Sequence, residues 1–198
     1  MKPKFLARKH ILMIVIPFLF FIQSTLYAAT IILPRPISLQ ADTLAHLRQA
    51  QPTGNEQWQL VVFGFTHCKD ICPASLANLS MLVKAASNEQ IKIGGIFVTV
   101  DPDRDTDARL ATYTQNFGSN IAYLRFEGEA LERFKATFGV EAVFYTKNAG
   151  NQHHYQVDHS TTAFLIDPAG RIRVIFDALE DVAHVAKLFK ENKVLFES

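Results

Sequence analysis

Two long apolar runs mark the centre of the predicted fold. The segments "QLVVFGF", Gln59–Phe65, and "IKIGGIFVTV", Ile91–Val100, are nearly free of charged residues. Neither alternates between polar and apolar positions, as a strand with one solvent-facing side would. Continuous runs of this kind are typical of strands that are buried on both faces. The pattern therefore predicts two buried strands in a sheet whose faces are both covered.

Apolar residues three or four positions apart predict the helices. After Pro73, the residues Leu76, Leu79 and Val83 recur at this spacing, which predicts a helix over about residues 73–87. Capping residues and closing glycines predict three further helices. The first ends at Phe117, the second ends at Gly139, and the third begins near Glu180. Helical and extended segments thus alternate along the chain.

The remaining apolar segments complete an α/β pattern. "IAYLRF" (121–126) predicts a third strand, and "TTAFLID" (161–167) and "RIRVIFD" (171–177) predict a hairpin across the "PAG" turn. We expect an α/β fold with a central mixed sheet and helices on both faces. The order β-α-β-α-β-β-α, with a cysteine motif at the first helix, favours a thioredoxin-like fold.

The segment before the first buried strand has a different character. Residues 30–56 contain Pro34 and Pro36 among several turn-favouring residues. We expect a lead-in or linker here, with only a short helical turn near residues 44–48. The thioredoxin-like domain is then expected over residues 57–198.

Residues 1–29 have the composition of an export segment. A basic stretch, "MKPKFLARKH", precedes twelve apolar residues, Ile11–Ile22, and the small and polar "QSTLYAAT". This apolar length suits a signal peptide cleaved after Ala28, since a full membrane span needs ~20 residues. A membrane anchor that is retained is the alternative, because Ile31–Leu33 extends the apolar stretch. Either interpretation places the body of the protein outside the cytoplasm, as in a bacterial periplasm.

Charge bears on the class of partner. The chain has a formal net charge of +1, but four of its 20 Lys and Arg residues precede residue 30, which leaves 16 against 19 acidic residues. A mildly acidic body without a basic patch argues against nucleic acid as the partner.

The chain has two cysteines, Cys68 and Cys72, in "FTHCKDICP", between the first strand and the first helix. Disulfides persist in an oxidising compartment, but closing so short a loop removes little chain entropy, so a chemical role is favoured over a structural one. A helix N-terminus favours thiolate, and His67 and Lys69 could add positive charge nearby. Thiolate is both the nucleophile of disulfide exchange and a metal ligand, so both kinds of chemistry stay open.

The spacing of the cysteines favours metal. Thioredoxin redox motifs have two intervening residues, whereas "CKDIC" has three. If this segment winds as a helical turn, Cys68 and Cys72 lie on one face and can reach a common point. Two thiolates are an incomplete set for most metals, and soft thiolate ligands, with imidazole as a compatible partner, suit copper. A third ligand is therefore expected elsewhere in the chain.

Seven histidines are the candidates for this ligand. His159, in "VDHSTTAFLID", stands just before a predicted buried strand, where we expect a loop edge that faces the end of the sheet. His153 and His154 lie in a polar loop and are expected to be exposed, although such a pair could bind metal adventitiously. The others are expected to be surface, neighbouring or export-segment residues: His10, His46, His67 and His184.

Three motifs in the same order resemble the Sco/SenC family. They are "FGFTHCKDICP", "TVDPDRDTDARLATYTQNFG" and "VDHSTTAFLIDPAGRIR", and the resemblance covers most of residues 59–196. It implies a membrane-tethered, thioredoxin-fold protein that carries copper to cytochrome c oxidase assembly. In that family the two cysteines of the CxxxCP motif and one distant histidine bind copper, which implies Cys68, Cys72 and His159 here.

The implied function is a copper metallochaperone that delivers copper to the copper-bearing subunit of cytochrome c oxidase or to another copper or thiol protein. An extracytoplasmic thiol–disulfide oxidoreductase, with Cys68 attacking and Cys72 resolving, is the alternative. The sequence departs from the family pattern at Lys69, where proline usually follows the first cysteine, and at Asp107, where proline usually follows "RDT". Neither change removes an expected ligand.

The segment "DPDRDTD" has two interpretations. In the first, Asp101 and Pro102 end a strand, and Asp105 or Thr106 caps the next helix. In the second, Asp101 lies near the cysteines, because the carboxyl ends of neighbouring strands meet at one edge of an open sheet.

Overall fold

The computed structural model describes residues 30–51, 57–146, 150 and 154–197. A six-stranded mixed sheet forms its centre, in the order β1-β8-β7-β2-β3-β4. The parallel part comprises β2 (Trp58–Gly64), β3 (Ile93–Thr99) and β4 (Ile121–Leu124). The antiparallel part comprises β7 (Thr162–Ile166), β8 (Arg171–Asp177) and β1 (Ile31–Ser38). The expected strands and the hairpin across "PAG" are confirmed.

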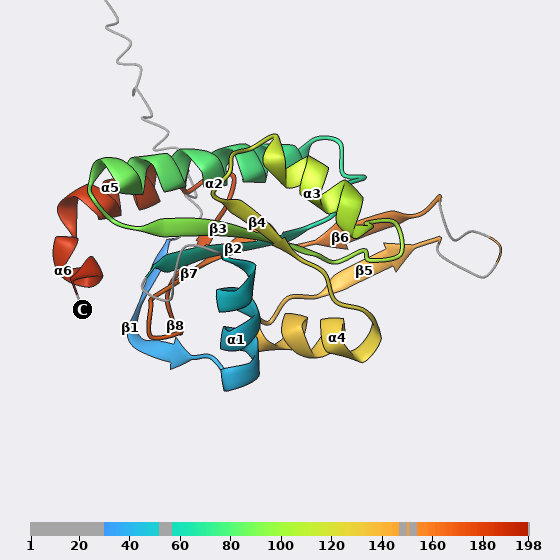
Figure 1. Ribbon diagram of the computed structural model, residues 1–198, viewed down its shortest axis with the longest axis horizontal. Helices are drawn as coiled ribbons and strands as arrows, with labels where there is room; N and C mark the ends of the chain where they lie inside the picture. The colour runs from blue at the N-terminus through green and yellow to red at the C-terminus, as the bar shows by residue number, and fades with distance from the viewer. Residues whose placement is uncertain (1–29, 52–56, 147–149, 151–153, 198) are drawn as a thin grey trace, which may run out of the picture.

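Helices cover both faces of the sheet, as expected for the α/β class (Figure 1). One face carries α2 (Ile71–Asn88), α3 (Asp107–Gln115) and α5 (Val182–Glu191), which is followed by the short α6 (Lys193–Phe196). The other face carries α1 (Ala41–Ala50) and α4 (Gly128–Thr137). All four helices expected from the sequence are present.

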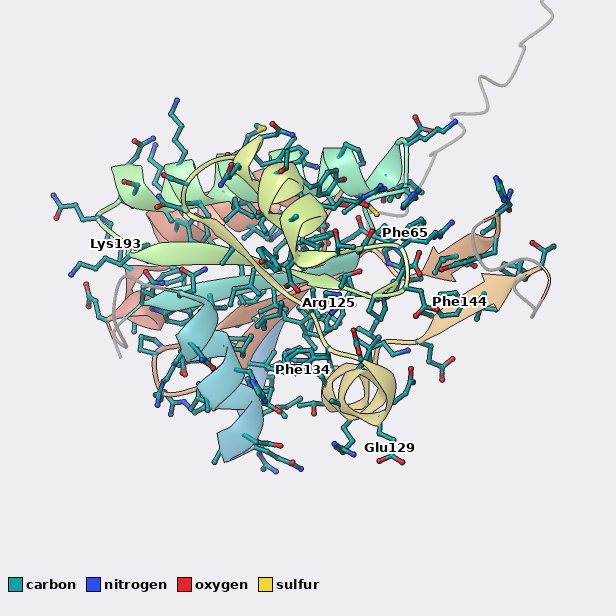
Figure 2. The ribbon with its side chains drawn as sticks, turned by 45° about the vertical axis from the view of Figure 1, so that its right-hand side comes forward. Phe65, Arg125, Glu129, Phe134, Phe144 and Lys193 are labelled. Atoms are coloured by element: carbon teal, nitrogen blue, oxygen red, sulfur yellow. The ribbon has the colours of Figure 1, made fainter. Side chains whose placement is uncertain are left out.

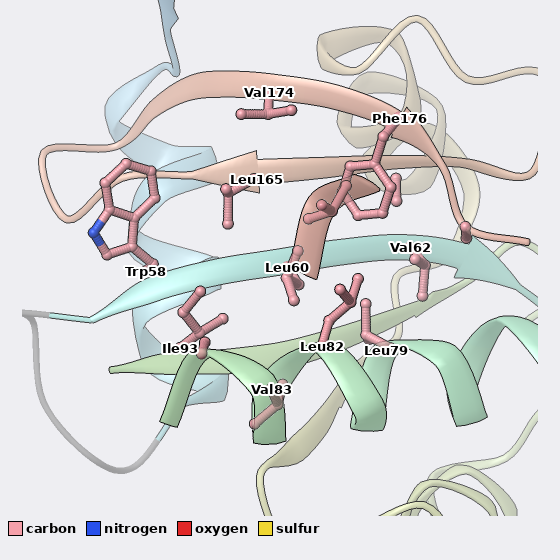
Figure 3. Close-up of a cluster of buried hydrophobic side chains, with 14 of the residues drawn as sticks. Trp58, Leu60, Val62, Leu79, Leu82, Val83, Ile93, Leu165, Val174 and Phe176 are labelled. Carbon is pink, nitrogen blue, oxygen red and sulfur yellow. The ribbon is translucent and has the colours of Figure 1, made fainter. Parts of the chain in front are cut away.

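Strand β2 is buried over its whole length, which explains its unbroken apolar run. Leu60 and Val62 pack towards α2, against Leu79 and Leu82 (Figure 3). Val61 and Phe63 point to the opposite side of the strand and pack in the cluster beneath α1 and α4. Burying each side chain of this size contributes roughly 1.5–3 kcal/mol. The strand that leads to the cysteines is therefore firmly anchored in the core.

The expectation of a linker over residues 30–56 was wrong for the part that the structure describes. Residues 31–38 form the edge strand β1, which pairs with β8, and residues 41–50 form α1. Pro34 and Pro36 lie where the pairing register shifts, between Ile32 and Ile37. Proline is tolerated at sheet edges and irregularities because no ladder hydrogen bond is needed there. The prolines therefore interrupt the ladder without excluding the segment from the sheet.

A hairpin that the sequence pattern did not reveal carries part of the site. Strands β5 (Ala142–Tyr145) and β6 (Gln156–His159) pair antiparallel and form a separate two-stranded sheet. They project from one end of the molecule (Figure 1). Each strand has four residues, which is too short for a clear alternation in the sequence.

Within the described ranges, no helix is long and apolar enough to cross a membrane. The expected export segment, residues 1–29, lies outside those ranges, as do His10 and His153.

Candidate metal centre

Cys68 and Cys72 lie where β2 leads into α2. Cys68 belongs to the connection and is half-buried, whereas Cys72 is the second residue of α2 and is 1% exposed. Both are free thiols. The backbone N–H of Cys72 donates to Sγ of Cys68 at 3.2 Å, so the two residues are in direct contact. The two residues are close although the segment does not wind as a full helical turn, because the helix begins only at Ile71, after Cys68.

Burial dominates the electrostatics of Cys72. It raises the pKa of the Cys72 thiol well above its usual range, and the neighbouring Cys68 adds to this effect. A buried thiol resists ionisation because the thiolate loses its hydration. The expectation that the helix N-terminus would favour thiolate is therefore wrong at Cys72. A cation that replaced the proton would remove this penalty, since metal binding stabilises the deprotonated form.

The polypeptide makes room for the Cys72 sulfur at Gly64, the last residue of β2. A Cβ atom at Gly64 would stand 3.1 Å from Sγ of Cys72 and 2.5 Å from Cε2 of Phe97. Carbon atoms do not approach one another as closely as 2.5 Å, so this position needs glycine. Cys72 is thus packed directly on the backbone of the central strand.

His159 is the last residue of β6, not part of a loop edge as the sequence suggested. Its Nε2 atom lies 3.6 Å from Sγ of Cys72, although 87 residues separate the two. Its Nδ1 atom lies 2.9 Å from the carbonyl oxygen of Ser160. A carbonyl can only accept, so Nδ1 carries the proton and Nε2 presents its lone pair to the thiol. Burial lowers the pKa of His159, which also favours the neutral ring.

The alternation of β6 explains why His159 points inwards. His159 and Val157 are partly buried, whereas Asp158 and Gln156 are exposed. Residues two apart share a face of a strand, so the inner face of the hairpin carries the imidazole. The ring of Phe65 meets the His159 ring edge-on at 5.8 Å between centroids.

The other described histidines lie elsewhere. His46 on α1, His184 on α5 and His154 beside β6 are exposed, as expected. His67 contacts Nη1 of Arg109 at 2.9 Å and lies 3.8 Å from Asp105. Burial and the cations of Arg104 and Arg109 lower the pKa of His67. The positive charge suggested for His67 is therefore not favoured.

The geometry brings the three expected residues into one place without completing a metal site. Cys72 contacts both Cys68 and His159. Across the residues that the structure describes, no group of three His, Cys, Asp or Glu side chains stands at metal-binding distances. Gathering all three donors around one ion would therefore require their side chains to rearrange. The assignment of these residues as ligands stays a prediction.

The segment "DPDRDTD" does more than cap α3, because its buried aspartates also hold residues close to the cysteines and to β6. Thr106 caps α3 by accepting from the backbone N–H of Arg109 at 3.3 Å. Asp105, which is fully buried, accepts from the backbone N–H of Thr66 at 3.0 Å and from the Thr99 hydroxyl at 2.6 Å. Asp105 therefore fixes the connection after β2 at Thr66, two residues before Cys68.

Asp101 is also fully buried, and it holds residues that the sequence did not single out. It pairs with Nε of Arg104 at 2.5 Å and accepts a hydrogen bond from the hydroxyl of Tyr155. Tyr155 directly precedes β6. No local pattern marks this contact, because 54 residues separate Asp101 from Tyr155.

Comparison with known proteins identifies the family. The model of the SCO1/SenC family matches residues 38–192. The chain belongs to the SCO1/SenC family. A Sco relative of Rickettsia prowazekii, "SCO2-like protein RP587", is 35% identical over 135 residues, which cover 67% of this chain and 64% of that protein. The mitochondrial "Protein SCO2 homolog" of Bos taurus is 30% identical, over 72% of this chain and 53% of its own length.

A solved Sco structure agrees with the fold. The crystal structure of Arabidopsis thaliana ScoI with copper bound matches with a TM-score of 0.65 and 25% identity, covering 81% of this chain and 98% of the other. The thioredoxin-like fold expected from the sequence is thus confirmed. This Sco chain spans about half to two thirds of the length of the two curated relatives.

Proposed function

We propose that this Sco protein is a copper metallochaperone that delivers copper during assembly of cytochrome c oxidase. The observation that carries the proposal is the approach of His159 Nε2 to within 3.6 Å of Cys72 Sγ. A fold that brings an imidazole lone pair to a buried thiol offers the mixture of soft and borderline donors that suits copper. The copper-bound structures of related Sco proteins support the same cargo.

Three donors form an open coordination shell, and this openness supports transfer. Cys68 and Cys72 supply thiolates, and His159 supplies a neutral imidazole whose proton is held by the Ser160 carbonyl. Ligands of a partner can then enter before those of the donor leave, so no free ion is released. The recipient is the copper-bearing subunit of the oxidase or another copper or thiol protein, since the Sco family is described as a family of cytochrome c oxidase assembly proteins.

The location that fits this role is extracytoplasmic. The basic and apolar pattern of residues 1–29 supports export, with cleavage or membrane anchoring as the two outcomes. A related structure, a SCO1/SenC family lipoprotein of Bacillus anthracis, supports association with a membrane surface.

Copper stoichiometry of the reduced protein tests the proposal. We expect one Cu(I) per chain, a nitrogen ligand in the X-ray absorption spectrum, and loss of that nitrogen in His159→Ala. The His46→Ala variant is the matched control, because His46 is exposed on α1. Unchanged affinity and spectrum in His159→Ala would refute the role of the third ligand, and absence of copper binding would refute the function.

A thiol–disulfide oxidoreductase is the second candidate, supported by the unequal exposure of the thiols. Half-buried Cys68 is accessible for attack on a partner disulfide, and buried Cys72 lies beside it to resolve the mixed disulfide. The two thiols become one disulfide, and the two electrons and two protons pass to the partner's cysteines. The Cys68–Cys72 disulfide would no longer bind copper, so the two functions exclude each other at any moment.

Disulfide reduction by the metal-free protein separates the two candidates. Reduction of insulin or of a partner disulfide at equal rates in the wild type and in His159→Ala would favour the oxidoreductase. Negligible reduction together with histidine-dependent copper binding would favour the metallochaperone.

A further inference from the structure

In the part of the chain that the structure describes, no strand pairing joins the hairpin that carries His159 to the central sheet. Strands β5 and β6 are hydrogen-bonded to each other and belong to a sheet of their own, whereas Cys72 is packed on β2 of the central sheet. The thiol and the imidazole therefore sit on two different structural units. Something other than a shared backbone ladder must set the distance between them.

A buried group of three residues joins these units, and we call it the Asp101–Arg104–Tyr155 latch. Asp101 and Arg104 come from the loop after β3, and Tyr155 directly precedes β6. The side chains are almost inaccessible: Asp101 is 0%, Arg104 6% and Tyr155 5% exposed. Charged groups are seldom buried this deeply unless they are paired.

The contacts of the latch are reciprocal. Asp101 accepts from Nε of Arg104 at 2.5 Å with one oxygen and from the Tyr155 hydroxyl with the other. Arg104 in turn donates from Nη1 to the carbonyl oxygen of Tyr155 at 2.9 Å, and its guanidinium carbon lies 3.7 Å from the centre of the Tyr155 ring. The backbone, ring and hydroxyl of Tyr155 are thus all held from one loop.

The latch is connected to the site along two routes. Val157 and His159 share the inner face of β6, and the buried Tyr155 directly before the strand continues the same alternation, so holding Tyr155 constrains the direction of His159. Arg104 also lies 5.7 Å from the centre of the Phe65 ring, which meets the His159 ring edge-on. Figure 2 shows Phe65 and Phe144 of β5 at the same end of the molecule, far from Lys193.

We propose that the Asp101–Arg104–Tyr155 latch positions His159 against Cys72, so that the third copper ligand depends on it. The inference rests on the proposed function for its copper readout, but the juxtaposition of the two side chains exists without copper. The three are positioning residues, because they act on His159 through the Phe65 ring and through the chain that runs from Tyr155 into β6. Residues that orient a ligand typically alter metal affinity on the order of 10–100-fold when they are replaced.

Two conservative variants test the latch, each with a matched control. Tyr155→Phe removes one hydroxyl, and Tyr145→Phe makes the same change at a half-exposed position on the same hairpin. Arg104→Lys keeps the charge and removes the planar fork. Arg173→Lys does the same in a similar setting at the far end of the sheet, where Arg173 pairs with Asp167 at 3.3 Å and faces Trp58.

Copper affinity is measured by competition with a Cu(I) chelator, and nitrogen ligation by X-ray absorption. We expect Tyr155→Phe and Arg104→Lys to weaken copper binding about 10–100-fold with partial loss of the nitrogen ligand, and both controls to keep wild-type values. In a His159→Ala background, Tyr155→Phe should have no further effect. An equal loss in both backgrounds would overturn the proposal, because the latch would then act on something other than His159.

A metal-free measurement keeps this inference separate from the proposed function. In the reduced protein without copper, nuclear Overhauser contacts between the Phe65 and His159 rings report their approach. We expect these contacts to weaken in Tyr155→Phe and Arg104→Lys but not in the controls. Unchanged contacts would overturn the latch even if copper binds, and weakened contacts would support it even if the wild type binds no copper.

Discussion

Gly64 offers a direct test of how tightly the fold constrains the Cys72 sulfur. The Gly64→Ala substitution adds one methyl group, which would meet Cε2 of Phe97 at 2.5 Å, Cζ of Phe97 at 3.0 Å and Sγ of Cys72 at 3.1 Å. Phe97 is 1% exposed and held within the core, so it has little room to move. We therefore expect part of the overlap to be relieved by displacement of the Cys72 side chain.

The magnitude follows from packing. Adding a methyl group to a filled core typically costs about 1–3 kcal/mol of the free energy of unfolding. Gly139→Ala is a control of similar cost, because Gly139 has φ +64 with no atom within 4 Å of an added Cβ. There the cost is roughly 1–2 kcal/mol of backbone strain, without a steric contact. The two variants thus separate loss of stability from displacement of the sulfur.

Urea unfolding of the reduced, metal-free protein gives the stability of both variants, and chelator competition gives their Cu(I) affinity. We expect both to unfold at lower urea, but only Gly64→Ala to bind copper at least about 10-fold more weakly, as for a displaced ligand. Wild-type copper affinity in a destabilised Gly64→Ala would refute the reasoning, since it would show that the core absorbs the methyl group without moving the sulfur.

Three further predictions concern stability around and away from the site. Asp105→Ala leaves the Thr66 N–H and the Thr99 hydroxyl without their buried acceptor, at roughly 1–3 kcal/mol for each stranded donor; a loss below this range in urea unfolding would mean that water replaces the carboxylate. Thr106→Ala removes the α3 cap and should cost about 0.5–2 kcal/mol with unchanged copper affinity; altered affinity would place Thr106 in the site. Phe189→Ala, at a fully buried position of α5, should cost about 3–5 kcal/mol by the same unfolding measurement; a smaller effect would indicate that α5 repacks.

The sequence predicted those parts of the fold where the local pattern of apolar and polar residues directly reflects how the element is buried. Strand β2 reads as an apolar run because both of its faces are covered. Strand β1 escaped prediction because its ends pair with β8 while Pro34 and Pro36 sit between them, so pairing depends on a partner far along the chain. Strands β5 and β6 are too short to show a period.

The site, too, contains residues that the sequence predicted and residues that it did not. Cys68 and Cys72 are close in sequence, so their spacing alone predicted a shared role. His159 was a candidate through its place before a strand, and the family resemblance supported it. The latch was not predictable from one sequence, because its geometry depends on a loop and a strand that meet only in the folded chain.

If Cys68, Cys72 and His159 bind copper as we propose, their placement on two structural units bears on the order in which they release it. Displacing Cys72 would require movement of a side chain packed on Gly64 and the central strand. His159 is only partly buried and lies on a hairpin outside that sheet, so displacing its ring leaves the central strands in place. We therefore expect His159 to leave first as a partner's ligands enter. His159→Ala should then speed copper transfer to an acceptor in stopped-flow experiments, whereas Cys72→Ser should abolish copper binding. Slower transfer from His159→Ala would contradict this order, because it would mean that the imidazole assists the exchange instead of delaying it.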